Sequence, residues 1–288
     1  ESTVDGRRVE GFYYSLDAAS RTRVEAPPID GKILTGWNGL AIEALAIAGS
    51  QLGRADWIAA ARRAADFVLD QHVLADRLVR TSIGGMRSSS HATLEDFGML
   101  ASGLLHLATA TGEVRYAIAA RDLVDACLAA GESSGQSFGV PGGGDPVLVA
   151  QGITVAADDS DGAHPSGLSA MCAAAYRLSV LTAEARYRNA AEAGMARVAA
   201  AASAQPLAYG AALGVMAALA EPVRQLVMVD DAALPRERYS VSVVVTQEQC
   251  DAFAAAGFEL FEGRRTAPGV TTAYVCDDFV CQLPVIVG

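Results

Sequence analysis

Three segments of the chain share one pattern of apolar and polar positions and align without gaps. They cover residues 37–68, 96–127 and 167–198. In each segment apolar residues recur at helical spacing, as at Phe97, Leu100, Leu104 and Leu107, which predicts a helix with one buried face. A short break follows, "GRAD", "GEVR" or "AEAR", and then a second helical stretch. Each segment is therefore predicted to be an αα-hairpin, and the chain to be an array of such units.

An aromatic residue falls at the same place in the second helix of each hairpin. These residues are Trp57, Tyr116 and Tyr187, and each is followed four residues later by an alanine. We interpret them as core anchors of the hairpins. A further first helix is predicted over residues 207–221, after Pro206.

The pattern changes near Pro222. Residues 224–230 and 239–245 are short and rich in valine, which is typical of strands. Residues 247–257 predict a helix that ends at Gly257, and "FELFEG" and "TAYVCDDF" complete a small α/β unit. The predicted fold is mainly α, with toroid-type helical hairpins forming a partial (α/α)6 barrel. We expect an N-terminal segment at 1–31, the hairpin domain at 32–221 and the α/β subdomain at 222–288.

Composition narrows the classes of function. Apolar residues make up 51% of the 288 residues and the formal net charge is −11, which argues against nucleic acid and anionic membrane surfaces as partners. No apolar run has the length of a membrane span and no signal peptide is visible. The five cysteines are too few for a disulfide framework, and Cys127 and Cys172 lie in apolar stretches typical of a core. We expect a cytoplasmic protein.

The candidate functional residues lie where the first helices begin. In an array of hairpins all first helices run the same way, so their N-termini share one rim. An indole beside amides, carboxylates and imidazoles is the composition of a sugar site. The candidates for chemistry are Asp30, Glu95, Asp96 and His164, and those for substrate binding are Lys32, Trp37, Asn38, His91 and Ser166. Thr35, Asp96 and Ser166 are also ordinary helix caps, and this alternative stays open.

The chain resembles a known family in four of its motifs. "IDGKILTGWNGLAIEALA", "TLEDFGMLASGLLHLATATGEVRY", "HPSGLSAMCAAAYRLSVLT" and "TAYVCDDFVCQLPVIV" look like the C-terminal part of the spermatogenesis-associated protein 20-like, thioredoxin-domain-containing family (YyaL-type in bacteria). The resemblance implies an (α/α)6 toroid similar to six-hairpin glycosidases and to N-acylglucosamine 2-epimerases. It also implies a thioredoxin-like domain elsewhere, although this chain contains no CxxC. Three and a half hairpins cannot close a ring of six, so we expect a fragment, a shortened variant or half of an assembly.

Two departures from the family bear on activity and on redox chemistry. The family's Pro-Ser-Gly-Asn-Ser has Leu168 in place of the amide, and an upstream basic residue is missing, which counts against activity. Cys276 and Cys281 match the family's terminal cysteine pair. We interpret them as fixing the tail of the small sheet; the alternative is a redox-responsive pair that exchanges with a thioredoxin-like partner.

Two hypotheses of function follow. The first is a carbohydrate-active enzyme: glycoside hydrolysis would use two of Asp30, Glu95, Asp96 and Asp161, whereas epimerisation would use a base such as His91 or His164. The second is a non-catalytic binding or scaffold module that works with a thioredoxin-like redox domain. The glycine-rich "GVPGGGDP" lacks the residues of a phosphate-binding loop. Neither a cofactor nor a metal is expected, and the expected ligand is a sugar or another small polar molecule.

Overall fold

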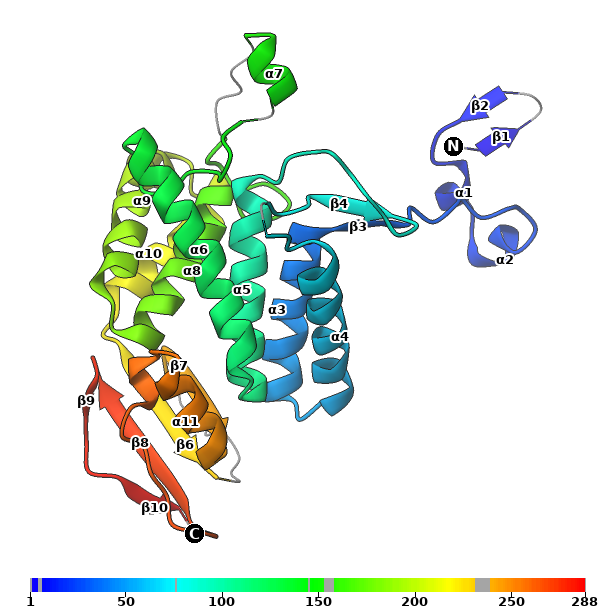
Figure 1. The fold of residues 1–288 in the computed structure, drawn as a ribbon. Coiled ribbons are helices and arrows are strands. Elements are labelled where there is room, and N and C mark those ends of the chain that lie inside the picture. The colour runs from blue at the N-terminus through cyan, green and yellow to red at the C-terminus, as the bar shows by residue number, and fades with distance from the viewer. Residues whose placement is uncertain are drawn as a thin grey trace.

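A computed structural model describes residues 2–4, 7–75, 77–144, 146–152, 158–230 and 239–287. The three predicted αα-hairpins are present (Figure 1). The first pairs α3 (Thr35–Gln51) with α4 (Ala55–Gln71), the second α5 (Leu94–Thr111) with α6 (Val114–Ser134), and the third α8 (Gly167–Thr182) with α9 (Ala185–Ala204). A fourth first helix, α10 (Gly210–Ala220), follows the short 3-10 helix η1 (Pro206–Ala208). The mainly helical fold is therefore confirmed.

The first helices α3, α5 and α8 pack against one another in sequence order, and α10 packs on α8. Glycines make this close approach feasible. A Cβ on Gly39 would lie 2.5 Å from the backbone of Met99, and one on Gly98 would lie 2.5 Å from the backbone nitrogen of Met171. Larger residues at these positions would push the helices apart. The positions of the glycines in the sequence therefore determine how closely the first helices pack.

The second helices are linked to one another by a repeated polar contact. The Tyr116 hydroxyl on α6 donates a hydrogen bond to Asp66 on α4 over 2.9 Å, and the Tyr187 hydroxyl on α9 donates one to Asp125 on α6 over 2.8 Å. Both tyrosines are fully buried, as predicted for core anchors, whereas Trp57 on α4 is half-buried. An arginine stacks on each tyrosine ring and also pairs with the same aspartate. The array is thus held by one type of link between successive second helices.

Short strands precede and cross the start of the first hairpin. Three of them, β3 (Lys32–Leu34), β4 (Thr81–Ile83) and β5 (Met86–Arg87), form an antiparallel sheet that the sequence pattern did not reveal. Further toward the N-terminus lie β1 (Ser2–Val4), β2 (Arg7–Val9), α1 (Phe12–Ser15) and α2 (Ala18–Arg21), which stand apart from the helical body in Figure 1. The short helix α7 (Pro146–Ala150) projects from the region between the second and third hairpins.

The C-terminal α/β unit packs against the helical array. Its sheet has the order β10–β8–β6–β7, where β6 (Arg224–Val229) and β7 (Val241–Val245) are parallel. The strands β8 (Thr271–Asp277), β9 (Val280–Cys281) and β10 (Val285–Val287) pair antiparallel. The helix α11 (Gln247–Ala255) contacts α6 and β7, and "FELFEG" contains the 3-10 helix η2 (Glu259–Phe261). Helix α10 ends and β6 begins on either side of Pro222.

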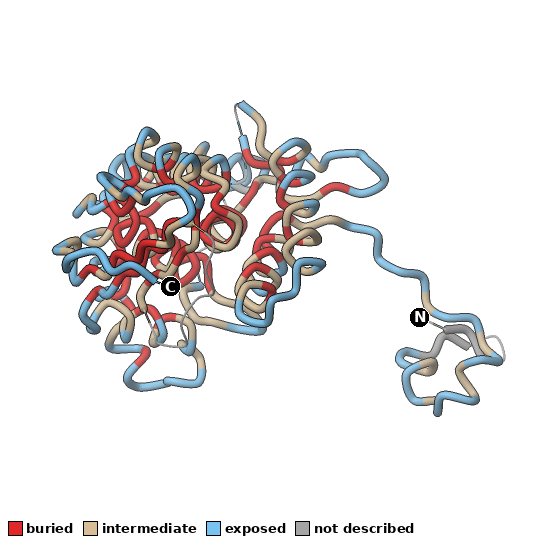
Figure 2. The backbone as a smooth tube through the Cα atoms, turned by 90° about the horizontal axis from the view of Figure 1, so that it is seen from below, coloured by how far each residue is buried: buried red, intermediate tan, exposed pale blue. Residues whose placement is uncertain are grey.

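One core runs through both parts of the chain, as the buried backbone in Figure 2 shows. It includes Leu104 and Leu178 from the hairpins and Phe253 and Phe261 from the α/β unit. Cys127 and Cys172 are fully buried within it, as predicted. None of the described helices combines the length and the apolarity that are needed to cross a membrane.

Candidate active site

The starts of the first helices are tied together at one rim by aspartates. Asp96, in the first turn of α5, accepts hydrogen bonds from Thr93 and so closes a capping box. Its other carboxylate oxygen accepts the backbone N–H of Gly36, in the first turn of α3, over 3.1 Å. The side chain is 5% exposed. Asp96 therefore satisfies backbone donors of two neighbouring helices that have no partner within their own helix.

Asp161 joins the next two helix starts in the same way. One of its carboxylate oxygens accepts the backbone N–H of Ser166, and the other accepts those of Ala211 and Ala212 at the start of α10. The Ser166 hydroxyl in turn accepts the backbone N–H of Ser169, and so caps α8. These bonds give Asp161 and Ser166 an explanation in helix capping alone.

The other candidates at this rim are more exposed. Asp30 pairs with Lys32 on the surface, and Trp37 is 59% exposed. The Asn38 amide donates to the backbone oxygen of Leu34. Glu95 is half-buried, close to Gly167 at the start of α8.

The two histidines of the rim also lie partly exposed. His164 contacts the backbone oxygen of Pro165 through Nδ1. His91 lines a cavity of about 30 Å³, which has room for roughly one water molecule. The rim thus brings Asp96 to α3 and Glu95 to α8, as the parallel array implies, but its described contacts are those of helix caps.

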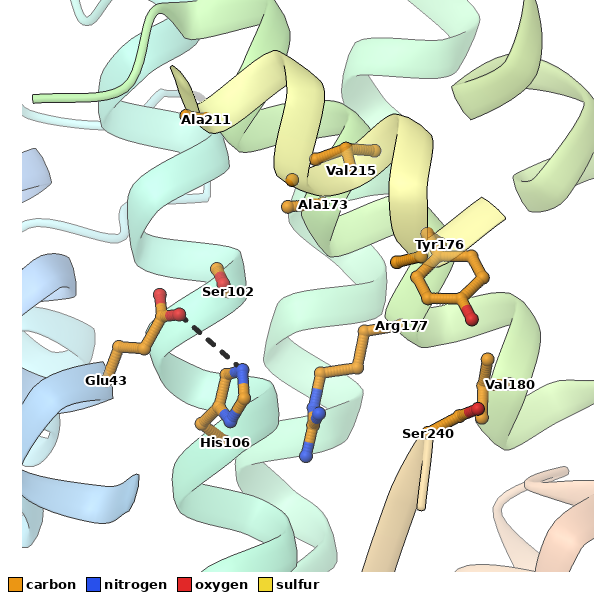
Figure 3. Close-up of a pocket in the computed structure, with 12 residues that line it drawn as sticks. Glu43, Ser102, His106, Ala173, Tyr176, Arg177, Val180, Ala211, Val215 and Ser240 are labelled. Atoms are coloured by element: carbon orange, nitrogen blue, oxygen red, sulfur yellow. Dashed lines mark ion pairs between the residues drawn. The ribbon is translucent and has the colours of Figure 1, made fainter. Parts of the chain in front are cut away.

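A larger cavity, of about 260 Å³, lies further along the same first helices. Its wall contains Glu43 from α3, and Ser102 and His106 from α5 (Figure 3). Helix α8 contributes Tyr176 and Arg177. Helix α10 and Ser240, just before β7, complete the wall. Glu43 lies six residues after Trp37, which is about 9 Å along the helix axis. Glu43, His106 and Arg177 thus line one shared space.

Glu43 and His106 lie next to each other in the wall of the cavity. His106 Nε2 lies 3.5 Å from Glu43 Oε1, the contact marked in Figure 3. Burial raises the pKa of Glu43, an effect that a hydrogen bond from Ser102 and the charge of Arg177 partly offset. Burial, followed by the charge of Arg177, lowers the pKa of His106 well below its usual value. At neutral pH the imidazole is therefore neutral, and the carboxylate is a stronger base than an exposed glutamate.

Arg177 supplies a cation with unused hydrogen-bonding capacity. Its Nη2 donates to the Thr109 hydroxyl over 2.9 Å, whereas its Nε is buried and has no hydrogen-bond partner. Burial lowers the pKa of the guanidinium to about 10, so the group stays charged at neutral pH. A buried donor without a partner costs free energy, and Thr109 uses only one of the donors of the guanidinium. Among the residues that the structure describes, no cluster of His, Cys, Asp and Glu has the arrangement to hold a metal ion.

Two mammalian proteins align with the chain. Human spermatogenesis-associated protein 20 is 26% identical over 285 residues, which is 90% of this chain and 35% of the human protein. The protein of the same name from Rattus norvegicus is 31% identical over 169 residues, which is 54% of this chain and 20% of the rat protein. The chain is therefore similar in sequence to proteins named spermatogenesis-associated protein 20. It spans about a third of the length of the human relative, and no model of a protein family matches it.

The sequence candidates did not include the cavity residues Glu43, His106 and Arg177. A signal for them is present in the repeat. Glu43, Ser102 and Ala173 hold one position of the aligned hairpins, and Ile47, His106 and Arg177 hold another, one helical turn later. Each of the three residues lies in an apolar stretch of its helix. Burial of an ionisable side chain there is costly unless the side chain has a function or a partner. Reading the two positions across all three copies would have singled them out.

Proposed function

We propose that the cavity is the active site of an enzyme that moves a proton next to the carbonyl group of a sugar-like substrate, as in epimerisation or isomerisation. The observation that carries this proposal is the facing pair of Glu43 and His106. A carboxylate made more basic by burial, next to an imidazole kept neutral, suits proton abstraction at a carbon beside a carbonyl. Neither group needs a cofactor for this step.

The proposed reaction balances on the residues of the cavity. The Glu43 carboxylate takes the proton from the carbon next to the carbonyl, and the electron pair of that C–H bond moves to the carbonyl oxygen. The guanidinium of Arg177 and the neutral imidazole of His106 stabilise the resulting enediolate. Return of the proton from Glu43 to the opposite face of the same carbon, after the enediolate has turned over in the cavity, gives the epimer. Return of the proton to the former carbonyl carbon gives the isomer, with His106 passing the proton of the neighbouring hydroxyl group to the former carbonyl oxygen. Glu43 is regenerated in either case.

The composition of the cavity favours this chemistry over glycoside hydrolysis. Hydrolysis by the usual route needs two carboxyl groups on either side of the bond that breaks. Within the described part of the chain, Glu43 is the only carboxylate that lines the cavity. Asp96, which served as a candidate for hydrolysis, is bound to backbone donors at the rim.

Proton exchange with solvent tests the proposal directly. The protein is incubated in D2O with a panel of aldoses, ketoses and N-acylated amino sugars, and NMR measures deuterium at the carbon next to the carbonyl. We expect incorporation by the wild type and a loss of about 100-fold in Glu43→Gln. Glu192→Gln is the matched control, because Glu192 lies on α9 and pairs with Arg188 away from the cavity. Equal exchange by wild type and Glu43→Gln would remove the carboxylate from the mechanism.

The second candidate function is a non-catalytic binding module. This candidate is supported by the length of the human relative, of which the chain aligns with 35%. A helical unit within a longer protein can serve a neighbouring domain. It predicts that sugars raise the melting temperature of the wild type without any deuterium incorporation. Release of new reducing ends from oligosaccharides would contradict both candidates and favour a hydrolase.

We also propose that the hairpins are part of an α/α toroid. The support is a face of α3 that none of the described hairpins covers. Trp37, Ala41 and Ala44 are exposed on it. Leu40 and Ala41 align with Met99 and Leu100 of α5, which α3 contacts through Gly39. A further first helix would fit this face of α3 as α3 fits α5.

A further inference from the structure

A disulfide bridges the hairpin at the edge of the C-terminal sheet. Cys276 on β8 and Cys281 on β9 are direct partners in the antiparallel register and are joined by this bond. Asp278 and Phe279 form the turn between them with φ of 47° and 65°, which is typical of the tight turn of a two-residue hairpin. Cys276 is fully buried, whereas Cys281 is partly exposed. An incoming reagent therefore meets the sulfur of Cys281 first.

A guanidinium lies against both sulfur atoms. Arg264 Nη2 is 2.9 Å from Cys281 Sγ and 3.5 Å from Cys276 Sγ. Its Nε donates to the backbone oxygen of Leu260, which fixes the side chain in this place. In the described part of the chain Arg264 forms no ion pair with a carboxylate within 4.0 Å. A neutral disulfide is a weak acceptor and gains little from this cation, but a thiolate gains a charge-assisted hydrogen bond.

The other cysteines lack such a setting. Cys127, Cys172 and Cys250 are free thiols, and all three are buried. Burial raises the pKa of Cys172 to about 12 and that of Cys250 to about 11, so both stay protonated at neutral pH. Burial thus disfavours the thiolate at Cys172 and Cys250, whereas Cys281 is partly exposed.

We propose that Cys276–Cys281 is a thiol–disulfide exchange site that accepts two electrons from a dithiol reductant. A thiolate of the reductant attacks Cys281 Sγ, a new S–S bond forms, and the Cys276–Cys281 bond breaks. The electron pair of that bond goes to Cys276 Sγ, which leaves as a thiolate beside Arg264. The second thiol of the reductant, after losing its proton to solvent, attacks the mixed disulfide and releases the Cys281 thiolate beside the same guanidinium. The reductant departs as a disulfide, and the protein holds the two thiolates or, after proton uptake, the two thiols.

Substitution of Arg264 separates this role from a merely structural one. Folded wild type, Arg264→Gln and Arg264→Lys are reduced with dithiothreitol, and alkylation with mass spectrometry follows the appearance of the two thiols. Arg265→Gln is the matched control, because Arg265 pairs with the exposed Asp251 and its side chain is not in contact with either sulfur. We expect Arg264→Gln to slow reduction about tenfold, with Arg264→Lys in between and the control within about twofold of wild type. Equal rates in all four proteins would overturn the proposal.

The wild type alone provides a second test, which stands even if the Arg264 variants fail to fold. The folded protein is exposed to glutathione, excess thiol is blocked, and peptide mass spectrometry locates the glutathione adduct. We expect the adduct on Cys281. An adduct on Cys276, or reduction that needs a denaturant, would overturn the exchange site. Neither test depends on the cavity, so a negative result in either test leaves the proposed proton transfer unaffected.

Discussion

Gly103 on α5 lies directly against Gly39 on α3, so closely that a Cβ atom on Gly103 would be 2.3 Å from the backbone oxygen of Gly39. The contact is between two backbones, which cannot rotate away as a side chain can. The distance between α3 and α5 therefore depends on this position staying a glycine.

We expect Gly103→Ala to lower the free energy of unfolding by about 3 kcal/mol, because the added methyl group overpacks the interface between α3 and α5. Urea denaturation measures the change. Gly214→Ala is the control: Gly214 lies within α10 with nothing near its missing Cβ, so alanine there should stabilise by about 0.5–1 kcal/mol through helix propensity. A neutral Gly103→Ala would mean that the two helices separate at little cost.

Asp96→Ala is expected to cost about 2 kcal/mol of stability, because it removes the cap of α5 and the acceptor for Gly36 at the start of α3. The neighbouring Glu95→Ala should cost much less, because no hydrogen bond to the Glu95 carboxylate is found within the described part of the chain. Thermal denaturation of both variants distinguishes them. If Asp96→Ala were as stable as the wild type yet inactive in the exchange assay, the catalytic prediction for Asp96 would be favoured over the capping one.

Tyr116→Phe and Tyr187→Phe should each destabilise the protein by about 1 kcal/mol, because each hydroxyl donates the same partly buried hydrogen bond to an aspartate of the preceding hairpin. Chemical denaturation of both single variants gives the comparison. Tyr176→Phe is the control in the same residue type, since the Tyr176 ring lines the cavity between hairpins and should matter for ligand binding more than for folding. A large difference between Tyr116→Phe and Tyr187→Phe would show that the two links are not equivalent.

Stability should decrease as the pH falls below about 6.5, partly because of His72. This histidine is fully buried between the Thr35 and Ser82 hydroxyls, and burial, with the charge of Arg87, lowers its pKa. The unfolded chain then takes up a proton near the ordinary pKa of histidine, whereas the folded chain takes it up only at lower pH. Between those two pKa values, the free energy of unfolding decreases as the pH falls, by at most about 1.4 kcal/mol per pH unit for one group.

The measurement is the slope of the unfolding free energy between about pH 7.5 and pH 5.5. Wild type and His72→Gln are compared, and the variant should show the shallower slope. His106 adds to the slope in the same direction, because burial also lowers its pKa. Glu43 opposes both, because its raised pKa lets the folded chain bind a proton before the unfolded one does. An unchanged slope in His72→Gln would show that this imidazole does not contribute.

The hairpins could be predicted from the sequence because their apolar spacing repeats over long stretches. The strands of the β3–β5 sheet could not, since they are two or three residues long and show no alternation. The common rim followed from the parallel direction of the first helices. The cavity did not, because which side chains face it depends on how closely the helices cross, and that distance is set at Gly39, Gly98 and Gly103. An ionisable residue in an apolar stretch of helix indicates a site only when the three hairpin sequences are aligned with one another.

The exposed face of α3 has a consequence for local unfolding of the molecule. Among the residues that the structure describes, the second hairpin packs on the first and the third, whereas the first hairpin packs on the second. In an array whose units are stabilised by their nearest neighbours, an end unit detaches at the lowest cost. Amide hydrogens of α3 and α4 should therefore exchange with solvent faster than those of α5. A molecule that binds over Trp37 should slow this exchange.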